Sequence, residues 1–312
     1  MMKIKFITFL SIICAIMVSC GNDNEPDGNR NNLKEGQIEM KIYPGYMNKV
    51  LFIVAVNTIK IDWGDGTVDD VKSNGIEQIF SHTYADNNLR TVLVNTTKLL
   101  HFYFDTFDYD PFGVSSLVEL RIGNCPTLKT ISVNNCQLTV LSINKADSLT
   151  SLNCSVNKIK ELDISGCNAL TTLYCANNQL TSLDVSGCSA LTYLDCKYNH
   201  LTSLDVTDCS VLSSLICYNN RLTSLVTKDC VYLLSLHCYN NQLSSLNISG
   251  CRSLKELYFP YNNLLESELN TIFSDLPTVS SSSDNIIWCA DNPGYYTCNK
   301  SIAKNKGWIF IE

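Results

Sequence analysis

Ten of the sixteen cysteines in this chain recur at a fixed step of 21 residues, in two series. The first series is Cys154, Cys175, Cys196, Cys217 and Cys238, and the second is Cys167, Cys188, Cys209, Cys230 and Cys251. Thiols held in columns could do two kinds of chemistry, since they could bind metal ions or pair as disulfides. Either chemistry would make the columns the functional centre of the protein.

The sequence disfavours both kinds of cysteine chemistry. Metal sites need local clusters such as Cys-x-x-Cys, and the sequence contains no such pair. Neighbouring cysteines of one series would lie close enough to bridge, but their side chains would leave parallel strands side by side, pointing into the interior. Val133 and Phe259 replace Cys175 in other periods, and Ala146 replaces Cys167. We therefore expect free thiols that fill a hydrophobic core, with a disulfide ladder as the alternative.

Each period has the form Leu-x-x-Leu-x-Cys-x-x-Asn-x-Leu-x-x-Leu-Asp-Val-Ser-x-Cys-x-x. The alternation in its two similar halves predicts two short parallel strands per coil, on opposite walls, with little or no helix. One period has too few inward side chains to bury its own core, so stability must come from stacking. The asparagine should turn the chain and hydrogen-bond the backbone of the adjacent coil. It recurs at Asn157, Asn178, Asn199, Asn220, Asn241 and Asn262.

The segment from about Leu117 to Leu264 resembles a leucine-rich repeat solenoid of the short bacterial kind, common in surface proteins of the Bacteroides group. Cys136 replaces the asparagine in the first period, a substitution that the leucine-rich repeat pattern allows. We assign residues 105–264 to this solenoid and expect a mainly β protein. The resemblance implies a surface protein that binds host extracellular proteins or neighbouring cells.

Residues 1–19 have the pattern of a bacterial signal peptide. Two lysines precede an apolar run from Phe6 to Val18, which is too short for a comfortable membrane span. The run ends at Cys20 in a sequence that resembles a lipoprotein cleavage box, which implies acylation of the Cys20 thiol. An ordinary secretion signal is the alternative. Acylation would anchor the protein to a membrane without spanning it.

Residues 20–36 are rich in Asn, Asp and Gly and predict a flexible tether. The acidic residues that follow Cys20 resemble the surface-export signals of Bacteroides-type lipoproteins. We therefore expect a lipid-anchored outer-membrane protein that faces outward, with a periplasmic face as the alternative.

Residues 37–104 change to β-type runs around two short motifs, Asp-Trp-Gly-Asp-Gly-Thr at 62–67 and His-Thr-Tyr at 82–84. Together the motifs resemble a PKD-type immunoglobulin-like sandwich, which would be a spacer and an N-terminal cap. The aspartates of the first motif, with Asp69 and Asp70, could suggest calcium. Their spacing does not match the calcium loop, and Asp-Gly is the usual chemistry of a tight turn.

Residues 265–312 break the period and predict a C-terminal cap. Apolar residues at 265, 269, 272, 273 and 276 have helical spacing, and Pro277 marks the stop. Further on, Cys289 and Asn292 recreate the Cys-x-x-Asn of the repeat, and residues 308–311 predict a last strand. A Cys289–Cys298 disulfide is an alternative to free thiols.

The charge and composition exclude some functions. The formal net charge of −7 argues against nucleic-acid partners, which need basic stripes. The four histidines stand in different contexts, without a nucleophile elbow, phosphate loop, metal-protease helix or spaced carboxylate pair. Asp163, Asp184 and Asp205 form a column, but each is expected to hydrogen-bond its own backbone turn. We therefore expect a monomer with no enzymatic activity, no cofactor and no metal.

Exposed aromatic residues cluster beside the cysteines, where consecutive coils would join them into a stripe. Tyrosine offers a large contact area with a polar tip and is enriched at interfaces. The sequence therefore predicts recognition of a protein partner, with glycan capture by stacking on sugar rings as the alternative and a purely structural role as a third. The candidate ligand-binding residues are Tyr174, Tyr193, Tyr198, Tyr218, His237, Tyr239, Tyr258 and Tyr261.

Overall fold

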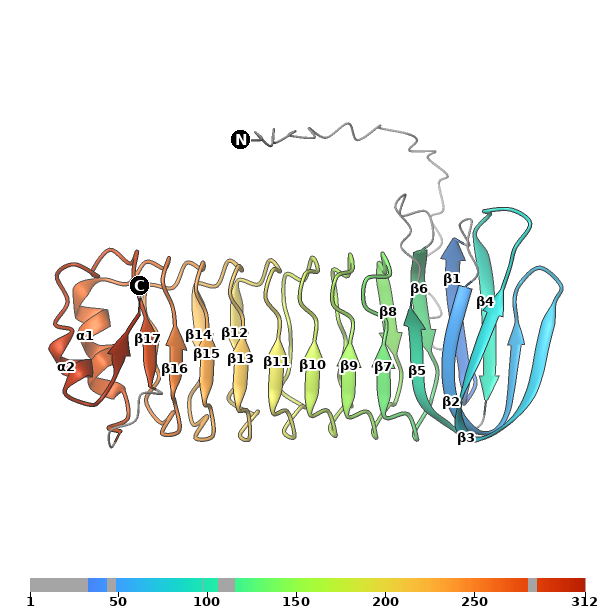
Figure 1. Ribbon diagram of the computed structural model, residues 1–312, viewed down its shortest axis with the longest axis horizontal. Coiled ribbons are helices and arrows are strands. Elements are labelled where there is room, and N and C mark those ends of the chain that lie inside the picture. Colours follow the sequence, from blue (N-terminus) through green and yellow to red (C-terminus); the bar gives the residue numbers. More distant parts are fainter. Residues whose placement is uncertain (1–32, 44–48, 97, 106–115, 280–284, 312) are drawn as a thin grey trace, which may run out of the picture. The chain divides into compact units, whose positions relative to one another are not determined.

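Successive 21-residue periods fold into coils that stack with equivalent residues side by side (Figure 1). The computed structural model describes residues 33–43, 49–96, 98–105, 116–279 and 285–311. The predicted signal peptide, the lipidation site at Cys20 and most of the tether lie outside the described residues. From Leu33 on, the chain is one compact unit. In the described part, no helix combines the length and apolar character that crossing a membrane requires.

One wall of the stack is a parallel sheet of very short strands, here termed the tyrosine wall. Most of these strands have three residues with a buried centre, because the central leucine points inward and its neighbours outward. Equivalent residues pair in register, as Thr172 does with Ser151 and Tyr193. The strands are β7 (Thr130–Ser132), β9 (Ser151–Asn153), β10 (Thr172–Tyr174), β11 (Tyr193–Asp195), β13 (Ser214–Ile216), β15 (Ser235–His237), β16 (Glu256–Tyr258), β17 (Ile286–Trp288) and β18 (Ile309–Phe310).

The opposite wall, here termed the aspartate wall, carries Asp163, Asp184 and Asp205 and is only partly paired. Its described strands are β8 (Val140–Ile143), β12 (Ser203–Asp205) and β14 (Ser224–Val226). The predicted second strand is missing from the coils of Asp163 and Asp184, where the aspartates would stand opposite one another. Like charges directly opposite destabilise a sheet. β12 pairs in register with β14, where Val226 and not an aspartate stands opposite Asp205.

Buried asparagines hold the coils together, as the sequence predicts. The side-chain nitrogen of Asn199 donates to the carbonyl oxygens of Cys196 in its own coil, at 3.1 Å, and Cys175 in the preceding coil, at 3.0 Å. Its side-chain oxygen accepts the backbone N–H of Leu180 at 3.0 Å. The same arrangement recurs at Asn178, Asn220, Asn241 and Asn262.

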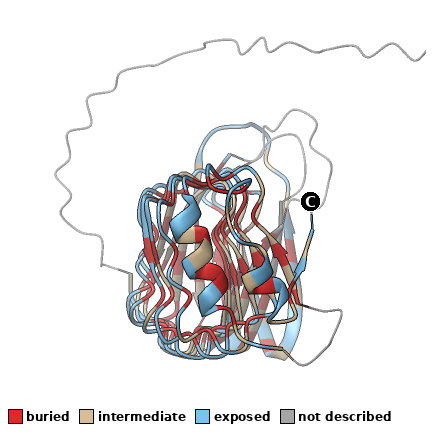
Figure 2. Ribbon diagram, turned by 90° about the vertical axis from the view of Figure 1, so that its left-hand side faces the viewer, coloured by how far each residue is buried: buried red, intermediate tan, exposed pale blue. Residues whose placement is uncertain are grey.

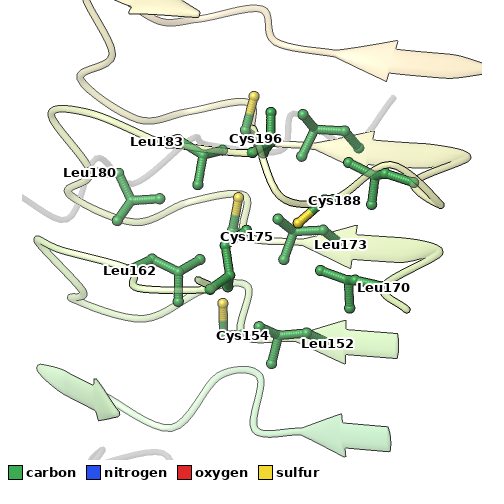
Figure 3. Close-up of a cluster of buried hydrophobic side chains, with 14 of the residues drawn as sticks. Leu152, Cys154, Leu162, Leu170, Leu173, Cys175, Leu180, Leu183, Cys188 and Cys196 are labelled. Atoms are coloured by element: carbon green, nitrogen blue, oxygen red, sulfur yellow. The ribbon is translucent and has the colours of Figure 1, made fainter. Parts of the chain in front are cut away.

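The cysteines of both series are free thiols in the hydrophobic core. Figure 3 shows Cys154, Cys175 and Cys196 above one another among buried leucines. Burial raises the pKa of Cys154 to about 12, so its thiol is uncharged at neutral pH. Thiols of the second series point toward neighbouring coils, and Cys209 donates to the carbonyl oxygen of Val185 at 3.7 Å. The core-filling prediction therefore describes the arrangement, and neither a disulfide ladder nor a Cys289–Cys298 disulfide is present.

The N-terminal strands belong to the same sheet as the solenoid. β5 pairs in parallel with β7 on the tyrosine wall, and β6 pairs in parallel with β8 on the other wall. Between them the order is β5-β2-β4-β1-β6, with β3 paired to β2. A separate PKD-like sandwich is thus not confirmed, because β5 and β6 pair with solenoid strands and the other N-terminal strands continue the same sheet. They are β1 (Gln37–Tyr43), β2 (Lys49–Asp62), β3 (Val68–His82), β4 (Arg90–Thr96), β5 (Leu99–Asp105) and β6 (Ser116–Ile122).

The C-terminal end has two helices, one more than the sequence predicts. α1 (Glu266–Asp275) occupies the predicted position and buries Leu269, Ile272 and Phe273, and Figure 2 shows buried and exposed segments alternating along the helix. α2 (Ser301–Lys304) is a single turn, too short to show a helical period in the sequence. The indole N–H of Trp308 donates to the carbonyl oxygen of Pro277 at 2.9 Å, which ties the end of the chain to α1.

Candidate functional site

The predicted aromatic residues occupy four kinds of position in the coil. Tyr174, His237 and Tyr258 end strands β10, β15 and β16, directly before a buried core residue, and Tyr193 begins β11. Two others, Tyr218 and Tyr239, directly follow a buried cysteine. The last two, Tyr198 and Tyr261, lie one residue further, in the turn before the ladder asparagine. The aromatic surface therefore runs from the tyrosine wall onto the turns beside it.

Six aromatic rings of this surface form one connected group, here termed the ring cluster. Tyr218 contacts Tyr198, with centroids 5.5 Å apart, and stacks on Tyr239 at 4.1 Å. Tyr239 then contacts Trp288 at 5.8 Å, and Trp288 contacts Tyr258 at 6.3 Å. Tyr258 stacks on His237 at 4.4 Å. The ring cluster comprises Tyr198, Tyr218, His237, Tyr239, Tyr258 and Trp288.

The other three candidates lie outside the ring cluster. Tyr174 and Tyr193 form a separate tilted pair with centroids 5.0 Å apart, on neighbouring strands. Tyr261 is 50% exposed, and its hydroxyl is hydrogen-bonded to the carboxylate of Asp291. The stripe predicted from the sequence is thus a ring cluster, a ring pair and a single exposed ring.

Trp288 is the member that sequence reasoning missed. It ends β17, whose residues pair in register with those of β16, so Trp288 lies directly beside Tyr258. The sequence did contain a signal for Trp288. Cys289 and Asn292 repeat the Cys-x-x-Asn spacing and so place residue 288 in the column of Tyr258.

Charged groups on the tyrosine wall are paired. The Lys197 ammonium lies 2.8 Å from the Asp195 carboxylate and 5.7 Å from the centroid of the Tyr218 ring. His237 contacts the hydroxyl of Ser235 at 3.1 Å and the carboxylate of Glu256 at 3.5 Å. Burial lowers the pKa of His237, so its imidazole favours the neutral form at neutral pH. The surface therefore presents aromatic rings and hydroxyls more than free charge.

Two of the candidate tyrosines, Tyr198 and Tyr261, adopt a left-handed backbone conformation that is unfavourable for tyrosine. The turn position two residues after the core cysteine is left-handed in every coil, with asparagine at 135, 177, 219 and 240. Asparagine accepts this conformation easily, whereas other L-residues lose roughly 1–2 kcal/mol. Tyr198 and Tyr261 occupy it with φ of 53° and 54°, and Val156 with 58°. All three side chains are about half exposed, so burial in the core does not explain their presence.

Acidic groups elsewhere bond to nearby protein groups. Asp184 accepts the backbone N–H of Ser186 at 2.9 Å, and hydrogen bonds with Ser186 lower the pKa of its carboxyl. In the N-terminal motif, Asp65 accepts the Thr67 hydroxyl at 2.6 Å and contacts His82 at 2.7 Å. Within the described ranges, no group of three or more His, Cys, Asp and Glu side chains is arranged to hold a metal ion.

The stacked coils, the asparagine ladder and the 21-residue period define a leucine-rich repeat solenoid. Residues 147–188 and 168–209 match the family model of leucine-rich repeats in two copies. None of the curated proteins compared with the chain matches it.

Solved leucine-rich repeat structures are similar to part of this chain. The functional domain of InlJ from Listeria monocytogenes, which includes a cysteine ladder, is 29% identical with a TM-score of 0.48, over 57% of this chain and 42% of that one. A leucine-rich repeat protein of Leptospira interrogans is 21% identical with a TM-score of 0.47, over 60% and 55%. YopM, a leucine-rich effector protein from Yersinia pestis, is 22% identical with a TM-score of 0.41, over 56% and 55%. The matches thus span 42% to 55% of those chains.

Proposed function

We propose that this protein is a non-enzymatic binding protein of the bacterial cell surface, and that its tyrosine wall recognises a protein partner. The ring cluster is the observation that supports this proposal. Six aromatic side chains gathered on the tyrosine wall and the turns beside it offer a large contact area at low cost in side-chain entropy. The partner that we propose is a host extracellular protein or a protein of a neighbouring cell.

The geometry of the rings favours a protein over a glycan. A sugar stacks on the open face of an aromatic ring. Tyr218 and Tyr239 are nearly parallel, with 12° between their planes, and so are His237 and Tyr258. Each of these rings therefore covers one face of its neighbour, which leaves fewer open faces for a sugar. Aromatic rings with hydroxyls suit the mixed polar and apolar surface of a protein.

The central rings should carry most of the binding energy. Replacing Tyr218 and Tyr239 together with alanine is expected to weaken binding of a protein partner by about 100-fold, the usual scale for two aromatic hot spots. The mature chain, unlipidated through Cys20→Ala, is applied to a panel of extracellular matrix proteins and to a glycan array. The affinity of any hit is then measured by calorimetry for both variants.

The matched control is the double variant Tyr232→Ala and Tyr296→Ala. These tyrosines are 60% and 87% exposed and lie outside the ring cluster, so their loss should leave affinity within about twofold. A partner bound equally well without Tyr218 and Tyr239 would place the binding site elsewhere. Binding to the glycan array alone would favour glycan capture.

The cellular location that we propose rests on the sequence around Cys20. The protein would be acylated at this thiol, anchored in the outer membrane and turned outward on its tether. Replacing Cys20 with alanine should abolish incorporation of labelled palmitate and move the protein from the membrane fraction to the soluble fraction. Degradation of the wild-type protein by protease added to intact cells tests the outward face. Palmitate labelling that survives the substitution would contradict the lipidation site.

A further inference from the structure

The turns beside the tyrosine wall carry a second, unassigned set of side chains, here termed the corner row. The row comprises the left-handed turn residues and the residues two positions after them, among them Lys158, His200, Arg221 and Asp291. It contains three left-handed residues with unfavourable side chains, Val156, Tyr198 and Tyr261. Four other coils place asparagine at the same position, so the coil itself does not require valine or tyrosine there. None of the three is buried in the core, so backbone strain at these half-exposed positions points to a contact outside the chain.

Cations accompany these strained residues. Lys158 follows Val156 by two positions. Arg221 occupies the equivalent position three coils further along the stack, after Gln179 and His200. Backbone hydrogen bonds fix both in the stack, from Lys158 to Leu138 at 2.8 Å and from Arg221 to Leu201 at 2.9 Å. Both side chains are exposed, and in the described part of the chain neither forms an ion pair with a carboxylate. His200 lies between them in the row.

This local charge is opposite in sign to that of the whole chain. The net charge is −7, and the aspartate wall carries a column of carboxylates. The corner row instead carries the cations Lys158 and Arg221, and the one described carboxylate in the row is Asp291 at its far end, bonded to Tyr261. Attraction between opposite charges selects partners and steers their approach, so the row favours an anionic ligand.

We propose that the corner row binds an extended acidic segment of a protein partner. This inference rests on the proposed function and names the chemistry of the partner. With coils roughly 4.8 Å apart, Lys158 and Arg221 lie roughly 14 Å from each other, the length of four to five residues of extended chain. Tyr198 lies between them and joins the row to the ring cluster through its contact with Tyr218.

The charge component is tested with a labelled copolymer of glutamate and tyrosine, bound to the full mature chain carrying Cys20→Ala. The double variant Lys158→Gln and Arg221→Gln should weaken binding by about tenfold or more and reduce its dependence on salt. The matched control, Lys228→Gln with Lys255→Gln, removes the same charge from exposed positions outside the row and should change affinity by less than about twofold.

The strain component is tested with Tyr198→Asn. Because asparagine suits the left-handed turn, this variant should melt about 2–4 °C higher than the wild type while binding the copolymer more weakly. A variant that binds as well as the wild type would show that Tyr198 does not contact the ligand. A lower melting temperature would show that Tyr198 is kept for stability, and either result overturns its role.

Three further outcomes would overturn the proposal as a whole. They are a copolymer that fails to bind, an equal loss in the control variant, and tighter binding of heparin that displaces the copolymer, which would indicate an anionic glycan. The proposed function is judged separately. A protein partner that depends on Tyr218 and Tyr239 but not on Lys158 and Arg221 would leave that function standing and remove only the corner row.

Discussion

Replacing Asn220 with alanine should lower the free energy of unfolding by about 3–5 kcal/mol, because it leaves several buried backbone groups without partners. The side-chain nitrogen of Asn220 donates to the carbonyl oxygens of Cys196 and Cys217, both at 3.1 Å, and Tyr218, at 3.4 Å. Its oxygen accepts the N–H of Leu201 at 3.0 Å. Alanine removes all four bonds and leaves the buried backbone groups without these partners. Urea unfolding followed by circular dichroism measures the loss.

Asn263→Ala is the matched control for this experiment. Asn263 is exposed, and its backbone N–H already donates to the carbonyl oxygen of Leu243 at 2.8 Å. Losing its side chain should change the free energy of unfolding by no more than about 0.5 kcal/mol. Equal losses in the two variants would show that asparagine contributes through turn propensity, and that the ladder hydrogen bonds contribute little.

The ladder also shows which parts of the fold a sequence can predict. The period of 21 residues places every leucine, cysteine and asparagine in a column, so the buried set follows from counting along the chain. The pairing of the aspartate wall does not follow from the period. Strands form in the coils of Asp205 and Val226 but not in those of Asp163 and Asp184, although the leucine spacing is the same.

The N-terminal strands illustrate a different limit. Their alternation predicts strands, and strands form, but the partner of each strand depends on contacts far apart in sequence. Phe102 of β5 is paired with Ile131 of β7, and Leu120 of β6 with Leu141 of β8. Two short motifs that resemble a PKD-type domain carried no information on these pairings, because they specify only the turn around Asp65 and its contact with His82.

The candidate site was predictable to the extent that it follows the period. The period predicts that Tyr218 and Tyr239 are neighbours, and their rings are in contact. Trp288 follows Tyr258 by 30 residues, because α1 is inserted before the last coil, and a search at the regular step passes over it. The left-handed backbone of Tyr198 was also hidden, since a sequence does not show which turn residue has positive φ.

Raising the pH to about 10 should strongly destabilise the folded protein, through its buried thiols. Burial raises the pKa of Cys154 and of Cys238 to about 12, from the ordinary value of 9.0. Because the pKa is raised in the folded state, these thiols contribute their full stabilisation below pH 9. This contribution is lost as the pH rises toward 12. At pH 10 each of these two thiols should cost about 1.4 kcal/mol, since only the unfolded chain is free to ionise. Burial raises the pKa of Cys175, Cys196 and Cys217 as well.

The destabilisation should appear as cooperative loss of the β signal in circular dichroism between roughly pH 10 and pH 11, because total stability is on the order of 5–15 kcal/mol. Tyrosine ionisation occurs in the same range, so the thiol contribution needs a separate control. Val133 already fills the column of Cys154 in an earlier coil, which makes Cys154→Val with Cys238→Val a conservative replacement. Between pH 8 and pH 10 this variant should lose about 3 kcal/mol less than the wild type, as measured by urea unfolding at each pH. If the two proteins lose the same stability, the thiols ionise without cost in the folded state. That result would contradict the burial of the two cysteine series in the hydrophobic core.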